Sequence, residues 1–229
     1  MMNKERKIAV IGTGKTGGTV MDLLGKRAIP FDETNPATID SLKKAEAAII
    51  FVPSDAASAV IEVLLEAAIP SVWGTTGFAW PADLPDRVKT AGVPWVIGSN
   101  FSLGIQVVRK AIESLGKGVE LLDDPQLHIH EVHHTDKKDA PSGTALSWRE
   151  WLGKEASISS DRVGDVKGRH ELTIKSAGET ITLSHEAHHR KIFAQGAIWT
   201  ANHLLDHPDI VPGLFRFEDL FDQAYGQED

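Results

Sequence analysis

The sequence predicts an α/β fold, in which a parallel sheet covered by helices is joined to a smaller domain with a mixed sheet. Three observations lead to this prediction. The first half alternates short apolar runs with amphipathic helical patterns, which is typical of a parallel sheet buried on both faces. A glycine-rich turn follows the first apolar run directly. The second half instead contains segments that alternate apolar and polar residues, as in strands with two unlike faces.

The first half is expected to form strands at its apolar runs and helices between them. The expected strands are residues 8–11, 47–52, 71–73 and 93–97, and the expected helices are residues 16–24, 56–68 and 82–91. Each run is rich in β-branched residues and is bounded by charged or glycine residues, which favours a strand. Another helix is expected after Ser102 and closes this half.

The second half is expected to form a separate domain. Its expected strands are residues 127–132, 171–175 and 180–184, and its expected helices are residues 144–152 and 197–205. The last two strands flank a turn at Gly178, which is typical of a β-hairpin. A mixed or antiparallel sheet follows from this pattern, and the change in pattern near Asn100 marks the domain boundary.

Composition excludes several classes of protein. The 229 residues carry 24 Lys and Arg against 32 Asp and Glu, a formal net charge of −8, which argues against general affinity for nucleic acid or a membrane surface. The lack of cysteine excludes a disulfide framework, a thiolate nucleophile and a Cys-ligated metal site. No segment approaches the ~20 apolar residues of a membrane span, and the charged start leads into a strand rather than a signal peptide. We expect a cytoplasmic protein that acts on a small molecule.

The glycine-rich turn has the spacing of a dinucleotide-binding loop. Glycines at positions 12, 14 and 17 form G-x-G-x-x-G between the first expected strand and the first expected helix. In such a loop the glycines allow a tight turn, close approach of a pyrophosphate, and close packing of helix on strand. The expected cofactor-binding residues here are Gly12, Thr13, Gly14, Lys15, Thr16 and Gly17. A glycine-rich connector without a ligand is the alternative interpretation.

Asp32 is the expected partner of the cofactor ribose. It stands about 20 residues after the loop, at the end of the second strand, where a carboxylate binds the 2′-hydroxyl of NAD. Such a carboxylate repels the 2′-phosphate of NADP, so NADH is slightly favoured over NADPH. Lys15 would weaken that preference, and an ordinary strand-end cap is the alternative role for Asp32.

Two more polar loops follow expected strands, at the edge of the sheet where ligands bind in open α/β folds. The first contains Gly74, Thr75 and Thr76, and the second contains Gly98, Ser99, Asn100 and Phe101. Each loop could be a polar turn, but their position favours cofactor binding.

Residues 131–145 contain the densest set of groups that transfer protons or bind anions. His133 and His134 can carry a proton near neutral pH, and Lys137 can act as an acid or bind a carboxylate. The free amides of Ser142, Gly143 and Thr144 at a helix start form a ready anion site. Strict strand alternation would direct His133 and His134 to opposite faces, so both can serve one pocket only if the strand ends there.

Two other interpretations of this region were weighed. The histidines at positions 128, 130, 133 and 134 could suggest a metal site, but alternation separates His128 and His130 from His133, and we expect no metal. Lys137 could instead belong to a solvated loop. Arg190 is either a solvated residue or a cation that completes the anion pocket from another strand.

Residues 131–145 read E-V-H-H-T-D-K-K-D-A-P-S-G-T-A, and at every specified position they match the signature E-x-H-H-x-x-K-x-D-A-P-S-G-T-A. The chain thereby resembles the 4-hydroxy-tetrahydrodipicolinate reductase (dihydrodipicolinate reductase) family. The resemblance extends to the glycine loop, to the loops at residues 74–78 and 100–102, and to residues 190–197.

The resemblance implies a Rossmann-type cofactor domain, residues 1–100 plus 203–229, and an inserted α+β domain, residues 101–202, that binds substrate and builds a homotetramer. It implies that His133 donates and accepts a proton and that Lys137 donates one. His134, Gly143, Thr144 and, with less support, Arg190 would bind the substrate carboxylates. The loops named above would bind NADH or NADPH.

The sequence departs from the family at the cofactor side. The family usually has Met before the last glycine of its loop, where this chain has Thr16, and its Asp-Phe-Ser/Thr-x-Pro stretch is reduced to residues 50–54. The segment around the second strand is also short. These departures affect the cofactor-side loops and leave residues 131–145 unchanged.

The resulting hypothesis is an NAD(P)H-dependent reductase of 4-hydroxy-tetrahydrodipicolinate in lysine and diaminopimelate biosynthesis. The alternatives are a reductase of another small dicarboxylate imine, a non-catalytic nucleotide-sensing homologue, and a divalent-metal hydrolase. A pocket for a dicarboxylate must be locally cationic even in a chain of net charge −8.

Overall fold

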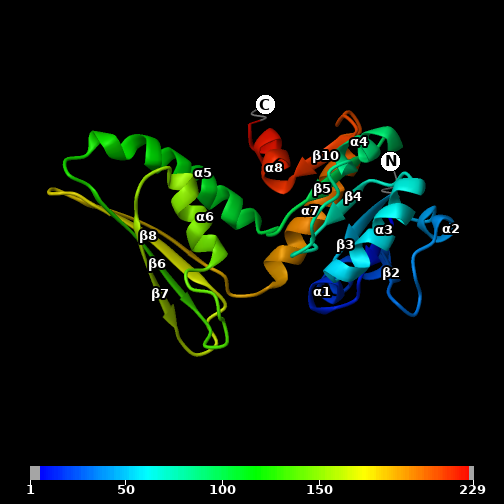
Figure 1. Ribbon diagram of the computed structural model, residues 1–229, viewed down its shortest axis with the longest axis horizontal. Helices are drawn as coiled ribbons and strands as arrows, with labels where there is room; N and C mark the ends of the chain where they lie inside the picture. The colour runs from blue at the N-terminus through cyan, green and yellow to red at the C-terminus, as the bar shows by residue number, and fades with distance from the viewer. Residues whose placement is uncertain (1–5, 227–229) are drawn as a thin grey trace. The chain divides into compact units, whose positions relative to one another are not determined.

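The computed structural model describes residues 6–226, and the chain forms two compact units (Figure 1). The first unit consists of Met1–Ser102 and Lys191–Asp229, and the second consists of Leu103–Arg190. No helix among the described residues is both long and apolar enough to cross a membrane. Each unit has a hydrophobic core of its own.

The first unit contains a six-stranded sheet in which neighbouring strands are parallel. In sheet order the strands are β10 (Gly213–Arg216), β5 (Pro94–Ile97), β4 (Ser71–Trp73), β3 (Ala47–Ile50), β1 (Ile8–Ile11) and β2 (Ala28–Phe31). The helices of this unit are α1 (Lys15–Leu24), η1 (Gly25–Arg27), α2 (Ile39–Leu42), α3 (Ser54–Glu66), α4 (Leu84–Ala91), α7 (Lys191–Asp206) and α8 (Phe217–Tyr225). Because β1, β3 and β4 are buried along their whole length, the predicted parallel sheet with two covered faces is confirmed.

The second unit contains a four-stranded mixed sheet, as predicted. Its strands in sheet order are β7 (Ser157–Arg162), β6 (Gln126–His133), β8 (Arg169–Lys175) and β9 (Thr180–Glu186). Its helices are α5 (Leu103–Gly118), η2 (Val119–Leu121) and α6 (Gly143–Leu152). β6 and β7 are parallel, whereas the other neighbours are antiparallel. The two long helices pack on one face of the sheet, where Trp148 is completely buried.

The boundary after the second unit differs from the expected one. Residues 191–202 were expected in the second domain, but α7 is one continuous helix that packs on α1 and β3 of the first unit. Its buried face is lined largely by small residues, which permit close packing, and a Cβ at Gly196 would overlap the backbone oxygen of Phe101. The boundary at residue 203 was therefore wrong, because the helix that begins at Lys191 belongs to the first sheet.

Two strands were not expected from the sequence. β7 contains only one apolar residue, Ile158, among six, and β10 is a short, half-exposed strand that begins with glycine. Both lie at the edge of a sheet, where a strand buries little surface and needs no continuous apolar run. β7 is held in place by its pairing with β6, and β10 by its pairing with β5, although neither segment has the sequence pattern of a strand.

Strand register divides the inner face of the second sheet into apolar and polar rows. The apolar row, in order across the sheet, is Ile158, Ile129, Leu172 and Leu183. The row two residues further along β6 is Ser160, Glu131, His170 and His185. Because residues two apart on a strand share a face, the apolar core ends in a row of titratable side chains. This row lies beside the start of α6, where the backbone N–H of Ser142 donates to Glu131.

Candidate active site

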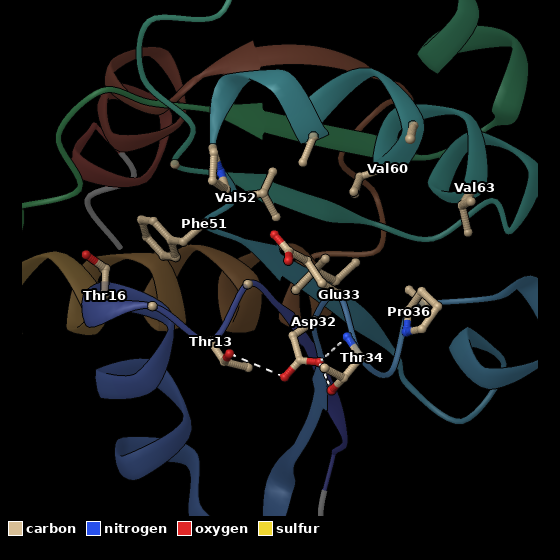
Figure 2. Close-up of a pocket in the computed structure, with 18 of the residues that line it drawn as sticks. Thr13, Thr16, Asp32, Glu33, Thr34, Pro36, Phe51, Val52, Val60 and Val63 are labelled. Carbon is tan, nitrogen blue, oxygen red and sulfur yellow. Dashed lines mark hydrogen bonds between the residues drawn. The ribbon is translucent and has the colours of Figure 1, made fainter.

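The glycine-rich loop of the first unit lines a cavity of about 920 Å³ at the carboxyl ends of β1, β2 and β3 (Figure 2). Five of the six residues expected to bind a cofactor in this loop line the cavity, namely Gly12, Thr13, Gly14, Lys15 and Thr16. Asp32, Gly74 and Thr76 line it as well. The structure thus brings together residues from three separate segments around one space.

The three glycines of the motif differ in what surrounds them. Gly12 has φ +95° and a Cβ there would overlap the backbone oxygen of Phe51, so only glycine fits this turn. A Cβ at Gly17 would overlap the oxygen of Gly12, which shows how closely α1 approaches the loop. Gly14 has open space around it, and α1 has no side-chain cap. The first amides of α1 are therefore free to bind an anion.

Asp32 lies at the end of β2 in a tight network of hydrogen bonds. Its Oδ1 accepts from the backbone N–H of Thr34 at 2.9 Å, from the Thr34 hydroxyl at 2.7 Å and from the backbone N–H of Asn35 at 3.1 Å. Its Oδ2 accepts a longer bond from the Thr13 hydroxyl, at 3.4 Å (Figure 2). These bonds, that of the Thr34 side chain first, lower the pKa of Asp32. The carboxylate is therefore held ionised, as a ribose ligand requires.

Glu33 adds a second carboxylate to this cavity and was not singled out from the sequence. It lines the cavity next to Asp32, and Figure 2 shows its side chain directed towards the side formed by Val52 and Val60. Two neighbouring acids at a strand end give the cavity a negative edge. The adjacent pair of acids in the sequence was the signal that could have found it.

The side of the cavity formed by α3 and the loop before it is apolar, and its residues were not among those predicted from the sequence. Val52, Pro53, Ala56, Val60 and Val63 line this side. Such an apolar surface can bind a flat aromatic base by packing against it, and this contact requires no hydrogen bonds. The signal was the position of these residues directly after β3, at the ligand-binding edge of the sheet.

The two other polar loops have different surroundings. A Cβ at Gly74 would overlap the ring of Phe51, and Thr75 is buried with its hydroxyl donating to the oxygen of Val52 at 3.1 Å. Thr75 therefore holds the loop, while its neighbours at positions 74 and 76 line the cavity. Gly98, Ser99, Asn100 and Phe101 lie outside the set of cavity-lining residues. The ring of Phe101 is buried against Phe217, 4.7 Å between centroids, and cofactor binding by this loop stays a prediction.

In the second unit, Glu131 and His133 form a buried pair at the end of β6. Oε2 of Glu131 lies 2.6 Å from Nδ1 of His133, and the exposed fractions of the two residues are 0% and 7%. The two atoms lie at ion-pair distance, but neither forms a hydrogen bond of normal geometry with any described residue, and His170 approaches the same oxygen only at 3.9 Å. The other oxygen, Oε1, accepts from Arg162 at 3.0 Å and from the backbone N–H of Ser142 at 3.1 Å.

The environment shifts the pKa values of this cluster in a consistent way. Burial raises the pKa of Glu131, but hydrogen bonds from Ser160, Ser142 and Arg162 outweigh it and lower the pKa to about 2. Burial lowers the pKa of His133, although the Glu131 carboxylate opposes that shift. Burial likewise lowers the pKa of His170 to about 4. At neutral pH the cluster thus contains an ionised carboxylate and neutral imidazoles.

Lys137 lies in the loop after β6, and its ammonium group pairs with Asp139. Nζ donates to both carboxylate oxygens of Asp139 at 2.8 Å. Arg162 donates through Nε to the oxygen of Lys137 at 3.2 Å and also binds the backbone oxygen of Asp139. Burial is the main cause of the lowered pKa of His133, and the positive charge of Lys137 lowers it further. The loop is therefore anchored by Arg162, with Lys137 close enough to His133 to act on its charge.

The start of α6 contains the three residues whose amides were expected to bind an anion, but the N–H of Ser142 is not free because it donates to Glu131. Ser142 is the N-cap, and its hydroxyl accepts from the backbone N–H of Ala145 at 3.2 Å, while Gly143 and Thr144 begin the helix. His134 follows the last residue of β6 and is half-buried, so the strand ends where the sequence required it to end. Arg190 is exposed and is the last residue of the second unit.

The structure brings together a potential metal-ligand set other than the one weighed from the sequence. His128 and His130 lie on the outer face, where their rings bond to the hydroxyl of Ser159 at 2.8 Å. Ligand atoms of Glu131, His133 and His170 instead lie within 4.8 Å of one another. Arg162 already pairs with Glu131, and the carboxylate lies directly beside an imidazole, so this group has the arrangement of a cluster of paired charges.

Comparison with known proteins gives consistent matches. The family model described as dihydrodipicolinate reductase, C-terminus, matches residues 104–221. The 4-hydroxy-tetrahydrodipicolinate reductase of Haloarcula marismortui is 32% identical over 254 residues, which cover 94% of this chain and 99% of that protein. The protein of the same name from Xanthomonas campestris pv. campestris (strain B100) is 37% identical over 165 residues, 70% of this chain and 66% of that protein.

Two solved structures show the fold at low sequence identity. The dipicolinate-bound dihydrodipicolinate reductase from Paenisporosarcina sp. TG-14 aligns with a TM-score of 0.75 at 18% identity, covering 94% of this chain and 99% of that chain. GenD2 from gentamicin A biosynthesis, in complex with NAD, aligns with a TM-score of 0.55 at 12% identity, covering 90% and 87%. Both have the parallel-sheet fold of the first unit.

Proposed function

We propose residue roles for the reaction of the dihydrodipicolinate reductase family, to which this chain belongs. The chain is a reductase that uses a nicotinamide cofactor and acts on 4-hydroxy-tetrahydrodipicolinate in lysine and diaminopimelate biosynthesis. In our proposal the first unit binds the cofactor, the second unit binds the substrate, and His133 and Lys137 transfer protons. The observation that carries it is residues 131–145, where a buried carboxylate–imidazole pair, an ammonium group and a helix start follow one another.

The proton balance of the reaction requires at least two groups. The substrate loses one hydroxyl as water and takes up one hydride and one proton. The bound nicotinamide supplies the hydride. Water loss needs one group that protonates the leaving hydroxyl and one that removes a ring proton, and the ring takes up a proton after hydride arrives. We assign these transfers to the imidazole of His133 and the ammonium of Lys137, side chains of types that act as general acids and bases in enzymes.

The two carboxylates of the substrate need cationic or N–H partners. We propose the amides of Gly143 and Thr144 for one of them, because a helix start attracts a carboxylate and the first turn of α6 contains no acidic residue. Lys137 binds a substrate carboxylate in place of Asp139, and the new contact is more desolvated than the one it replaces. Arg190 supplies further positive charge, and His134 supplies a further N–H donor. Bound carboxylates raise the pKa of His133 and so favour its protonated form.

We propose that the enzyme prefers NADH to NADPH. Asp32 is ionised and Glu33 lines the same cavity, so a ribose 2′-hydroxyl can donate a hydrogen bond where a 2′-phosphate would be repelled. Lys15 is the one cation among the residues that line the described cavity. A single lysine offsets two carboxylates only in part, and we therefore expect both cofactors to work and NADH to work better.

We also propose a homotetramer, located in the cytoplasm. Within the second unit, α5 and α6 pack on the inner face of the sheet, while the outer face carries His128, His130 and Ser159 in a ladder of hydrogen bonds. A sheet face that lacks helices within its own unit is a natural surface for a second copy of the chain. Light scattering of the purified protein tests the tetramer, and a monomer would contradict it.

The test of the function is an absorbance assay of reduced nicotinamide with enzymatically generated 4-hydroxy-tetrahydrodipicolinate. We expect substrate-dependent oxidation of both cofactors, with the higher kcat/KM for NADH. Oxidation only with a different dicarboxylate imine would reassign the substrate. Absence of oxidation with both cofactors, in a protein that still binds them, would indicate a nucleotide-binding homologue without this activity.

A further inference from the structure

The polar row on the inner face of the second sheet contains more titratable groups than the proton transfers require. Glu131 is the central one, completely buried and in contact with partners from four elements. These partners are His133 on β6, Arg162 on β7, His170 on β8 and Ser142 at the start of α6. A buried carboxylate is costly unless its oxygens are paired, so its orientation is strongly determined.

The two oxygens of Glu131 have different tasks. Oε1 is fixed by Arg162 and by the backbone N–H of Ser142, which belong to two other elements of the unit. Oε2 is left to face Nδ1 of His133 at 2.6 Å. The carboxylate therefore cannot rotate away from the imidazole without giving up two hydrogen bonds at its other end.

We propose that Glu131 is a positioning residue for His133, which holds Nδ1 of the ring and so directs Nε2 to the substrate as the atom that transfers the proton. This inference rests on the proposed role of His133. In the neutral ring, the carboxylate beside Nδ1 favours the tautomer with the hydrogen on Nδ1, so Nε2 is the unprotonated nitrogen that collects a proton and passes it on.

The surroundings of Nε2 fit this orientation. A Cβ at Gly168, which has φ +151°, would lie 3.0 Å from Nε2 of His133 and 3.3 Å from its Cδ2. A side chain at residue 168 would therefore crowd Nε2, and glycine avoids this. The charge around His133 is mixed, since Glu131 favours its protonated form, while Lys137, Arg162 and burial disfavour it.

The carboxylate also sets the pH range in which His133 can donate. Removal of the Glu131 charge leaves two nearby cations and a buried imidazole, so the pKa of His133 falls further. Loss of an opposite charge at this distance typically changes a pKa by about 1 to 3 units. Because a proton donor is active in its protonated form, the fall in activity with rising pH then begins at lower pH.

The test compares Glu131→Gln with wild type and with Glu150→Gln, a matched change at an exposed carboxylate on α6 of the same unit. In the full-length protein the imidazole of His133 is followed by ¹⁵N–¹H NMR as a function of pH, its signals assigned by their loss in His133→Gln. We expect Glu131→Gln to lower the pKa of His133 by about 1 unit or more and to weaken the Nδ1–H preference. The descending limb of kcat against pH shifts equally, and KM changes less than kcat.

A second variant keeps the proposal testable if Glu131→Gln does not fold. Glu131→Asp retains the charge that Arg162 needs but withdraws the oxygen from Nδ1, so the tautomer preference of His133 weakens while its pKa changes little. Unchanged tautomer and pKa in both variants would overturn the proposal and leave Glu131 as a structural partner of Arg162. A shift of the His133 signals on adding a chelator to wild type would overturn it in favour of a bound cation. If His133→Gln retains normal turnover, the proposed proton transfer fails, whatever NMR reports for Glu131.

Discussion

The two units prepare for ligands by opposite means. In the first unit the cavity is formed at the glycine loop by backbone amides, absent side chains and one fixed carboxylate. In the second unit the site is formed by charged side chains that are buried and paired with one another. A site formed by closely packed backbone should be sensitive to any added side-chain atom. A site formed by paired charges should be most sensitive to the removal of a charged group. The predictions below test that difference.

Loss of the imidazole in the second unit should have the largest effect. His133→Gln keeps a polar side chain of similar length but cannot transfer a proton near neutral pH. We expect kcat to fall about 10²- to 10⁴-fold, with a much smaller change in KM, because the group acts on the reacting atoms. Steady-state kinetics with both cofactors checks this result. A KM effect larger than the kcat effect would instead make His133 a binding residue.

Removal of the ammonium group at position 137 should affect both catalysis and binding. Lys137→Ala is expected to lower kcat about 100-fold and also to raise KM, because one side chain is assigned both tasks. Lys138→Ala, at the neighbouring exposed residue, is the matched control and should change neither value. If turnover stays near normal while KM rises, Lys137 binds the substrate carboxylate and is not an acid.

One added methyl group in the first unit should lower the stability of the protein nearly as seriously as a lost charge in the second unit lowers its turnover. Gly17→Ala forces a Cβ into the oxygen of Gly12, and overpacking of this kind costs about 3 kcal/mol in the free energy of unfolding. Gly18→Ala is the control one residue along the same helix. Its nearest atom is the oxygen of Thr13 at 3.6 Å, so it should stabilise α1 by up to about 1 kcal/mol. Urea denaturation measures both, and equal stabilities would contradict the close approach of α1.

Loss of the fixed carboxylate of the first unit should have the smallest effect on turnover and the clearest effect on cofactor choice. Asp32→Asn removes the charge while keeping most of the size. We expect KM for NADH to rise about tenfold, the loss of one hydrogen bond to a charged group, and KM for NADPH to fall. Glu33→Gln removes a charge without disturbing the bonds to Thr34 and Asn35 and should give a weaker change in the same direction. An unchanged preference in both variants would exclude these acids as the source of selectivity.

The same contrast explains how much the sequence could predict. The glycine spacing, the position of Asp32 and the loop at residues 74–76 follow from local chain geometry, so this part of the cavity lining could be predicted from residues close together in the sequence. The loop at residues 98–101, predicted in the same way, lies outside that lining. The signature at residues 131–145 singled out His133 and Lys137, and the helix signals predicted a helix start near Ser142, which is the N-cap of α6. Contacts made by strand register could not be read in this way. Arg162 lies on a strand with one apolar residue, and His170 faces Glu131 only because β6 and β8 pair as they do.

The return of the chain to its first sheet has a consequence for synthesis on the ribosome. α7 packs on α1 and β3, and β10 pairs with β5, so residues 191–216 complete a layer begun at residue 8. The second unit, Leu103–Arg190, is continuous and has all its strands before α7 is made. Because translation adds residues in order and domains generally fold as units, a growing chain can complete the second unit before the last strand of the first unit has been made. Chains truncated after residue 190 and released from the ribosome should therefore resist proteases in residues 103–190 and be cut in the earlier segment.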